Sequence, residues 1–269
     1  SPVMGGLFAY LVFQYINKAI FSTRRPLAHA KELLPFIVSV VFFILSIAIC
    51  YKGLKNLHLD LEFSNVLLIA FVMGTLGFFL SKVLVRYIPD DDSKDFAHQF
   101  NTTENLFKYL QILTAFYIAF AHGSNDVANA VGPLAAVVSI LDGGVVGMKV
   151  AMPIWILGLG GGFIVFGLMV WGYRVMATVG ENITDITPSR GFCATFGAAS
   201  VVLICSKMGL PISTTHTLVG SIIGVGLARG LPTLNLGIIK MIFISWVTTI
   251  PFTAIISMIF FKAFLLFLP

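Results

Sequence analysis

The sequence has few charged residues. Only 11% of its 269 residues are Asp, Glu, Lys or Arg, and 58% are hydrophobic, whereas about 25% of the residues in a soluble domain are charged. The mean hydropathy of +0.96 agrees with this balance. The composition excludes an ordinary soluble domain and predicts an integral membrane protein.

Cysteine is also scarce. Cys50, Cys193 and Cys205 lie in apolar segments and lack the spacing of a metal site. We expect them to be small core residues and expect no transition metal. Basic patches interleaved with aromatic residues are lacking too, so the net charge of +5 predicts no nucleic-acid partner.

The short alternating strands of an outer-membrane barrel are not found in the sequence. Several apolar runs instead reach the roughly 20 residues that a helix needs to cross a hydrocarbon layer. The expected fold is an all-α integral membrane protein, a multi-span helical bundle. The predicted spans are 3–20, 33–51, 65–88, 106–141, 151–179, 192–208, 212–228 and 237–268.

Loop charges predict the orientation of the bundle. The segment 18–35 is the most basic, so we place it in the cytoplasm. Two spans later the chain returns there, and the polar stretch 89–105 is expected to be a solvated loop. The predicted location is the plasma membrane, with multiple passes.

The sequence lacks an initiator Met and a signal peptide, so we expect a chain whose preceding part is absent. Residues 1–20 and 250–269 both place proline second, then small residues, then an apolar and aromatic run. This match suggests an internal repeat. The predicted domains are 1–20, the last helix of a truncated first repeat; 21–105, connecting helices and a cytoplasmic loop; and 106–269, a whole second repeat.

The stretch AHGSNDVANAVGP, residues 121–133, places polar residues inside a long apolar run. Residues 106–141 would form a helix about 54 Å long, so the glycines and proline of this stretch predict a break. An ionised Asp126 at bilayer depth is costly unless it meets a cation, a partner or water. The nearest Lys or Arg residues are Lys108 and Lys149, so we expect no local salt bridge.

Oxygen-bearing side chains lie near Asp126 at helical spacing. Asn125, Asp126 and Asn129 are expected to share one flank of a helix. With backbone carbonyls freed by the break, they favour a hard cation such as Na⁺ or a proton relay, and a polar packing cluster is the alternative. Gln111 and Thr114 extend this flank, although Thr114 could equally bond to its own backbone.

A second polar stretch, PISTTHTLVGS at 211–221, opens an apolar segment. Ser213, Thr214 and Thr215 cluster at the expected start of a helix, where free N–H groups and the helix dipole favour an anion. Ordinary capping by one of these residues is the alternative. His216 could belong to this site or be a hydrogen-bonded core histidine.

The two segments 192–208 and 212–228 would each span about 25 Å. Short, Gly/Pro-interrupted pairs are typical of re-entrant or discontinuous helices at a transport site. One polar stretch therefore suits a cation and the other an oxyanion, which predicts a cation-coupled anion transporter. An enzyme is not expected, because His122 and Ser124, the nearest nucleophile–base pair, do not face each other at i, i+2 on a helix.

Three stretches resemble the inorganic phosphate transporter family, the sodium- or proton-coupled phosphate permeases. They are LFKYLQILTAFYIAFAHGSNDVANAVGP (106–133), ITPSRGFCATFGAAS (186–200) and GLPISTTHTLVGSIIGVGLARG (209–230). The resemblance covers most of the chain. It implies two inverted repeats, each with an Asn-Asp and a Ser-Thr-Thr-His signature, and phosphate held between them near mid-membrane.

The candidate site has two parts. The resemblance implies that Ser213, Thr214 and Thr215 help to hold phosphate and that Asn125, Asp126 and Asn129 help to bind the coupling cation, sodium in the first instance. We add Asn125 to the phosphate contacts and, from its helical spacing, Gln111 to the cation contacts. Further candidates are His216, Ser124 and Thr114.

Two departures from the family pattern bear on this expectation. One copy of each signature is present, so the chain is expected to hold about half of the site. The other half would come from the missing first repeat, in the same polypeptide or in another chain. A homo-oligomer is left open. Thr195 stands where many relatives carry Glu, which leaves the coupling ion open between sodium and a proton.

The predicted function is cation-coupled symport of inorganic phosphate across the lipid bilayer by alternating access. The alternatives are a passive anion channel and a transporter of sulfate or another oxyanion. No cofactor is expected besides the transported phosphate and cation.

Overall fold

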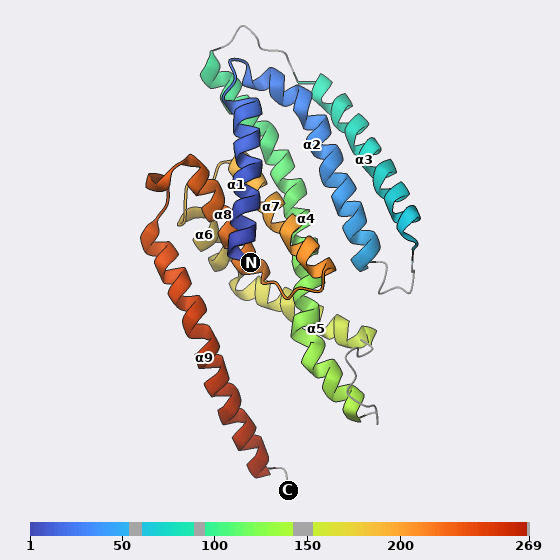
Figure 1. The fold of residues 1–269 in the computed structure, drawn as a ribbon, viewed down its shortest axis with the longest axis vertical. Coiled ribbons are helices and arrows are strands. Elements are labelled where there is room, and N and C mark those ends of the chain that lie inside the picture. Colours follow the sequence, from blue (N-terminus) through green and yellow to red (C-terminus); the bar gives the residue numbers. More distant parts are fainter. Residues whose placement is uncertain (54–60, 89–94, 142–152, 268–269) are drawn as a thin grey trace.

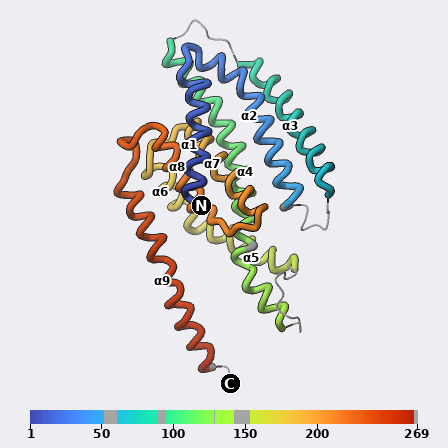
Figure 2. The backbone as a smooth tube through the Cα atoms, viewed as in Figure 1, coloured from blue at the N-terminus to red at the C-terminus, as the bar shows by residue number. Residues whose placement is uncertain are grey.

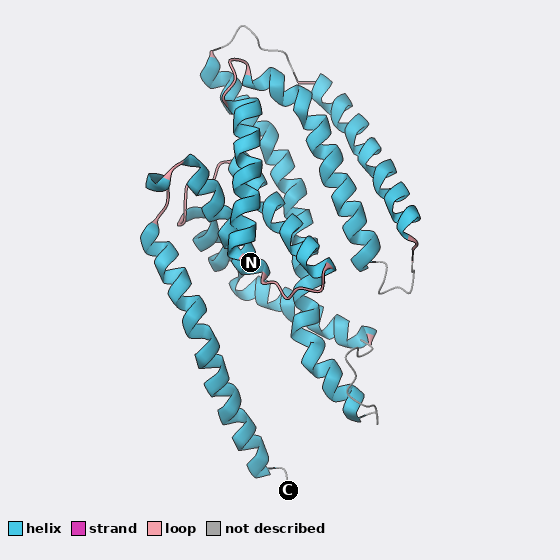
Figure 3. Cartoon of the chain, viewed as in Figure 1, coloured by secondary structure: helices cyan, strands magenta, loops and turns pink. Residues whose placement is uncertain are grey.

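The computed structural model describes residues 1–53, 61–88, 95–141 and 153–267. Within these ranges the chain is helical and has no strand (Figure 3). The main helices are α1 (Pro2–Ile16), α2 (Pro26–Ala48), α3 (Phe63–Arg86), α4 (Phe96–Leu141), α5 (Ile154–Gly167), α6 (Tyr173–Glu181), α7 (Pro188–Lys207), α8 (Thr214–Arg229) and α9 (Leu236–Phe267). The predicted all-α class is confirmed.

Short π-helical turns extend three of these helices. They are η1 (Asn17–Phe21) after α1, η2 (Ile49–Gly53) after α2, and η4 (Leu168–Gly172), which joins α5 to α6; η5 (Leu231–Thr233) is a 3₁₀ turn before α9. Among the described residues, seven helical stretches are long and apolar enough to cross a membrane. They are 2–21, 26–51, 63–86, 96–141, 154–181, 188–207 and 236–266.

Two predicted helix starts lie too late in the sequence. The second helix begins at Pro26 and not at 33, because proline fits the first turn of a helix, where its missing N–H costs nothing. Pro188 likewise starts α7, so this helix has 20 residues and is long enough to span. Two helices were expected to be too short to span, and only one of them is: α8 has 16 residues.

Helix α4 contradicts two predictions. Its 46 residues run through Gly123, Gly132 and Pro133 without interruption, so the expected break is wrong. A glycine costs a helix about 1 kcal/mol, whereas each backbone group left unpaired in a bilayer costs several. A continuous helix pairs these groups within itself and is therefore favoured over a break. The polar stretch predicted as a loop over 89–105 is helical from Phe96 onward, and 89–94 lie outside the described residues.

Helix α7 is the centre of the bundle. It packs against α1, α4 and α8, and two thirds of its most apolar stretch is buried within the protein. Phe13 of α1, Tyr117 of α4 and Phe192 of α7 belong to one apolar core with Val219 of α8. This core brings residues of α4 and α8 that are about 100 positions apart in the sequence to one place (Figure 1).

The α1–α8 crossing depends on small residues. A Cβ atom on Gly224 would overlap the backbone of Gly6, and one on Gly220 would overlap the backbone of Pro2. Glycine therefore permits the two backbones to touch, as small residues do in membrane helix pairs.

Other helices lie at the edges of the bundle. Helices α2 and α3 form a pair beside it, and α9 runs away from it, so that the C-terminus lies far from the core (Figures 1 and 2). None of the most apolar stretch of α9 is buried within the described part of the chain. The far end of α4 packs on α5 through a small separate cluster, Val131, Ala135 and Ile156.

Candidate functional site

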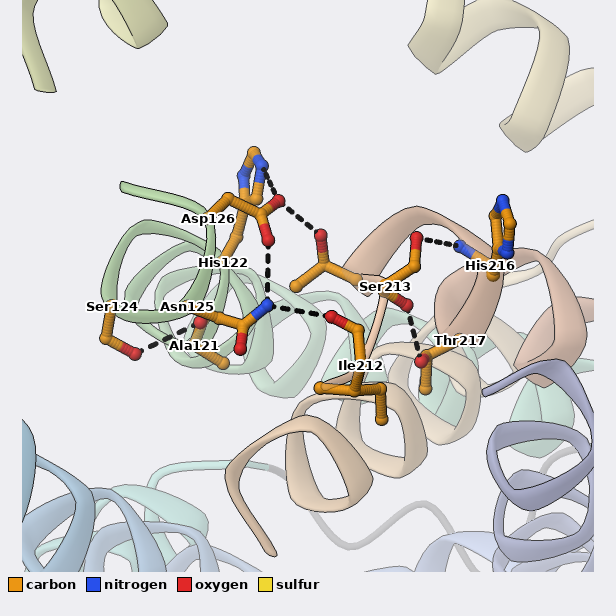
Figure 4. Close-up of polar contacts among 10 residues, drawn as sticks. Ala121, His122, Ser124, Asn125, Asp126, Ile212, Ser213, His216 and Thr217 are labelled. Carbon is orange, nitrogen blue, oxygen red and sulfur yellow. Dashed lines mark hydrogen bonds and ion pairs between the residues drawn. The ribbon is translucent and has the colours of Figure 1, made fainter. Parts of the chain in front are cut away.

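The two polar motifs meet where α4 passes the start of α8. Thr214 Oγ1 donates a hydrogen bond of 2.6 Å to Asp126 Oδ2. Figure 4 shows Asn125 and Asp126 facing the segment that carries Ile212 and Ser213. Thr214 is the first residue of α8 and is 5% exposed, whereas the Asp126 side chain is 27% exposed. The stretch predicted to hold a cation and the stretch predicted to hold an anion thus share one hydrogen bond.

Asn125 fixes this junction from the neighbouring position on α4. Its side chain is buried, and its Nδ2 group donates to Asp126 Oδ1 at 2.8 Å and to the carbonyl oxygen of Ile212 at 3.0 Å. The first bond orients the carboxylate, and the second ties α4 to the segment that leads into α8. The site therefore has a preformed geometry.

His122 is the partner of Asp126 that the sequence analysis missed. Its Nε2 lies 2.8 Å from Asp126 Oδ2, one helical turn away on the same face of α4. The expectation that Asp126 has no local salt bridge is wrong, because a protonated histidine pairs with a carboxylate as Lys or Arg does. The i, i+4 spacing of His122 and Asp126 was the signal that could have predicted the contact.

Ser213 caps α8, as the capping alternative proposed. Its Oγ accepts a hydrogen bond of 3.3 Å from the backbone N–H of His216, and its carbonyl accepts 2.7 Å and 3.0 Å bonds from the side chain and backbone of Thr217. The hydroxyl of Ser1 accepts a bond of 3.3 Å from the N–H of Ser213. Thr215 lies at an exposed position.

Two other residues of the first motif point elsewhere. Asn129 is exposed and makes no hydrogen bond among the described residues, so it does not join Asp126 in this structure. The hydrogen bonds from the segment that starts α8 are made with Asn125 and Asp126. Ser124 donates to the carbonyl of Ala121 on its own helix, at 3.1 Å.

Gln111 and Thr114 form part of a separate contact between α4 and α7. Thr114 lies 2.7 Å from the hydroxyl of Thr195 and also bonds to its own backbone, the carbonyl of Gln111, at 3.1 Å. The Gln111 side chain packs directly on Gly191. Fifteen residues, or about 22 Å of helix, separate Gln111 from Asp126, so these residues do not contact the same ion here.

His216 packs against α9. Its ring stacks on Trp246 with centroids 4.1 Å apart and an interplanar angle of 29°. No local pattern in the sequence links residues thirty positions apart, so this contact was not predictable. It holds α9 next to the first turn of α8.

The arrangement places a carboxylate at the start of a helix, the position that favours an anion. Thr214 and Asn125 donate to it, and His122 lies within hydrogen-bond distance. Among the residues that the structure describes, no group of three or more His, Cys, Asp or Glu side chains is placed to hold a metal ion. The oxygen atoms that could hold a cation here are those of the Asp126 carboxylate, the Asn125 amide and nearby hydroxyls.

Comparison with known proteins identifies the family. The phosphate transporter family matches residues 1–257 of the chain. The chain belongs to this family. Its members are transporters and not enzymes, and with its candidate spans the chain is a multi-pass integral membrane protein.

Relatives and a solved structure agree with this assignment. The chain is 45% identical over 267 residues to the "Putative phosphate permease" of Haemophilus influenzae, covering 97% of this chain and 62% of that protein. A protein of the same description from Pyrococcus horikoshii is 43% identical, with coverage of 99% and 64%. A solved structure titled "The sodium-dependent phosphate transporter" is 41% identical, with a TM-score of 0.80, over 93% of this chain and 60% of the other. The chain thus spans just under two thirds of the length of these relatives.

Proposed function

We propose that this chain provides one part of a phosphate transporter that moves inorganic phosphate together with Na⁺ across the plasma membrane by alternating access. The observation that carries the proposal is the 2.6 Å hydrogen bond between Thr214 and Asp126. It links the residue best placed to hold a cation to the helix start best placed to hold an oxyanion. The sodium-dependent phosphate transporter named above supports the choice of both ions.

The phosphate part of the site is the first turn of α8. Backbone N–H groups there point away from the helix, and the helix dipole adds positive potential. The Thr214 hydroxyl is the buried donor, and Thr215 offers an exposed one. Ser213 contributes indirectly, because its hydroxyl accepts the N–H of His216 and so caps the helix start that carries Thr214 and Thr215.

Coupling follows from the position of Asp126. Its carboxylate already accepts the Thr214 hydroxyl, so an incoming phosphate competes with it for this donor and is repelled by its charge. Two unit charges about 4 Å apart interact with about 4 kcal/mol at an effective dielectric constant of 20. A Na⁺ bound to Asp126 offsets a repulsion of this size and releases Thr214, so phosphate binds well only after the cation.

Asp126 also favours phosphate over sulfate. At neutral pH a phosphate ion carries at least one protonated oxygen, which can donate a hydrogen bond to a carboxylate, and sulfate carries none. A sulfate ion would instead place an unprotonated, negatively charged oxygen against the Asp126 carboxylate, which repels it. Competition by sulfate should therefore be weak.

The remaining part of the site is assigned to the first repeat. The relatives are longer than this chain, and Thr215 and Asn129 lie at exposed positions beside the junction. In this proposal an inverted first repeat, in the same polypeptide or another chain, covers these residues, and rocking of one repeat against the other exposes the site alternately.

Phosphate uptake into proteoliposomes tests the proposal. The protein is reconstituted together with its first repeat, and phosphate entry is measured with an inward Na⁺ gradient, with equal Na⁺ on both sides, and with a proton gradient alone. We expect saturable uptake that requires the Na⁺ gradient for accumulation. Accumulation driven by the proton gradient alone would assign the coupling to H⁺, and non-saturating flux without any gradient would show a passive channel.

A further inference from the structure

An apolar groove outside the phosphate site lies between α2, α3 and α4. It encloses a cavity of about 380 Å³ and is lined by Val38 and Phe42 of α2, Leu80 and Leu84 of α3, and Leu110 and Leu113 of α4. Helix α2 lies between the other two and packs on both (Figure 1). The size is within the range of ligand sites in proteins.

One end of this groove is basic. A smaller cavity of about 290 Å³ is lined by Lys31 of α2 and by Lys82 and Arg86 of α3, and it shares Val85 and Ile88 with the apolar groove. Lys82 and Arg86 are exposed, and Lys31 donates a hydrogen bond of 2.6 Å to the carbonyl of Ile88, which holds the end of α3 against α2. The apolar and basic parts are therefore continuous.

The depth of the groove matches one leaflet of a bilayer. From Lys31 at the basic rim to Phe42 at the far end, α2 advances eleven residues, or about 16 Å. Half of a hydrocarbon layer about 30 Å thick is about 15 Å. The rim lies at the same end of the bundle as the segment 18–35, the end placed in the cytoplasm, where anionic lipids attract basic side chains.

We propose that this groove binds one anionic phospholipid, with an acyl chain between α2, α3 and α4 and the phosphate headgroup on Lys82 and Arg86. Charge complementarity selects this occupant, because an apolar helix would leave the basic rim unpaired and a free phosphate would leave the apolar cavity unfilled. A headgroup with a net negative charge is preferred over a zwitterionic one.

Native mass spectrometry of the purified protein in detergent tests the proposal with phosphatidylglycerol and phosphatidylcholine of identical acyl chains. We expect the wild type to bind phosphatidylglycerol more tightly. K82Q/R86Q should weaken that binding about 30-fold, which is about 1 kcal/mol for each side chain at 1.4 kcal/mol per factor of ten. K240Q/K262Q removes two charges from α9, away from the groove, and should leave the preference unchanged.

Two further measurements distinguish a bound lipid from free inorganic phosphate in the groove. Leu113→Trp fills the groove without changing its charge and should weaken phosphatidylglycerol binding about tenfold, and millimolar inorganic phosphate should not displace the lipid. The proposal is overturned if the wild type binds both lipids equally, if K240Q/K262Q loses the preference as K82Q/R86Q does, or if inorganic phosphate displaces the lipid.

Discussion

Replacement of Thr214 by Val isolates the hydroxyl that joins the two motifs. Valine keeps the volume and β-branching of threonine, so the packing of this buried residue is preserved while its donor is lost. The hydroxyl donates to Asp126 at 2.6 Å in this structure, and in the proposed mechanism Na⁺ releases it to donate to phosphate. A hydrogen bond to a charged group such as phosphate contributes about 1.5–3 kcal/mol, so we expect phosphate affinity to fall about 10- to 150-fold.

The assay is the phosphate concentration dependence of Na⁺-driven uptake in proteoliposomes. Thr214→Ser restores the hydroxyl and should return the half-saturating concentration to within about threefold of the wild type. Thr217→Val is a matched control, because this hydroxyl lies on the same helix, is equally buried, and bonds only to the carbonyl of Ser213. An unchanged affinity in Thr214→Val, or an equal loss in Thr214→Ser, would refute the role of the hydroxyl.

Two further predictions concern the structure around the site. Gly224→Ala places a methyl group against the backbone of α1 and should destabilise the protein by about 1–3 kcal/mol, measured as a lower thermal unfolding temperature in detergent; Gly161→Ala, where a Cβ meets nothing within 4 Å, should cause no loss. A double-mutant cycle of His216→Ala and Trp246→Ala, read from the same unfolding temperatures, should give a coupling energy of about 0.5–1.5 kcal/mol, and additive effects would contradict the ring stacking.

The helical class and most spans were predictable from the sequence, because an uninterrupted apolar run of about 20 residues has the length of a helix that crosses a bilayer. The continuity of α4 was not predictable in this way. The glycines and the proline of 121–133 weaken a helix locally, but whether it breaks depends on partners for the freed backbone groups, and those partners come from distant segments.

The candidate site was predicted in part for the same reason. The chemistry of Asp126 and of Thr214 followed from residue type and position, and their proximity was implied by the family resemblance. Helical spacing predicts that Asn129 and Asp126 lie on the same side of α4. It does not predict which part of that side a neighbouring helix covers, and Asn129 is exposed. The contact of His122 with Asp126 could have been predicted from the same helical spacing, because the two residues are four positions apart.

The central claim is that Asp126 couples the cation to phosphate, and the Na⁺ dependence of phosphate binding tests it most directly. Binding of phosphate to the protein purified together with its first repeat is measured by calorimetry over a range of Na⁺ concentrations, for the wild type and for Asp126→Asn. This substitution keeps the size of the side chain and removes its charge. We predict that phosphate affinity rises with Na⁺ in the wild type and is nearly independent of Na⁺ in Asp126→Asn. Full Na⁺ dependence in Asp126→Asn would contradict the claim.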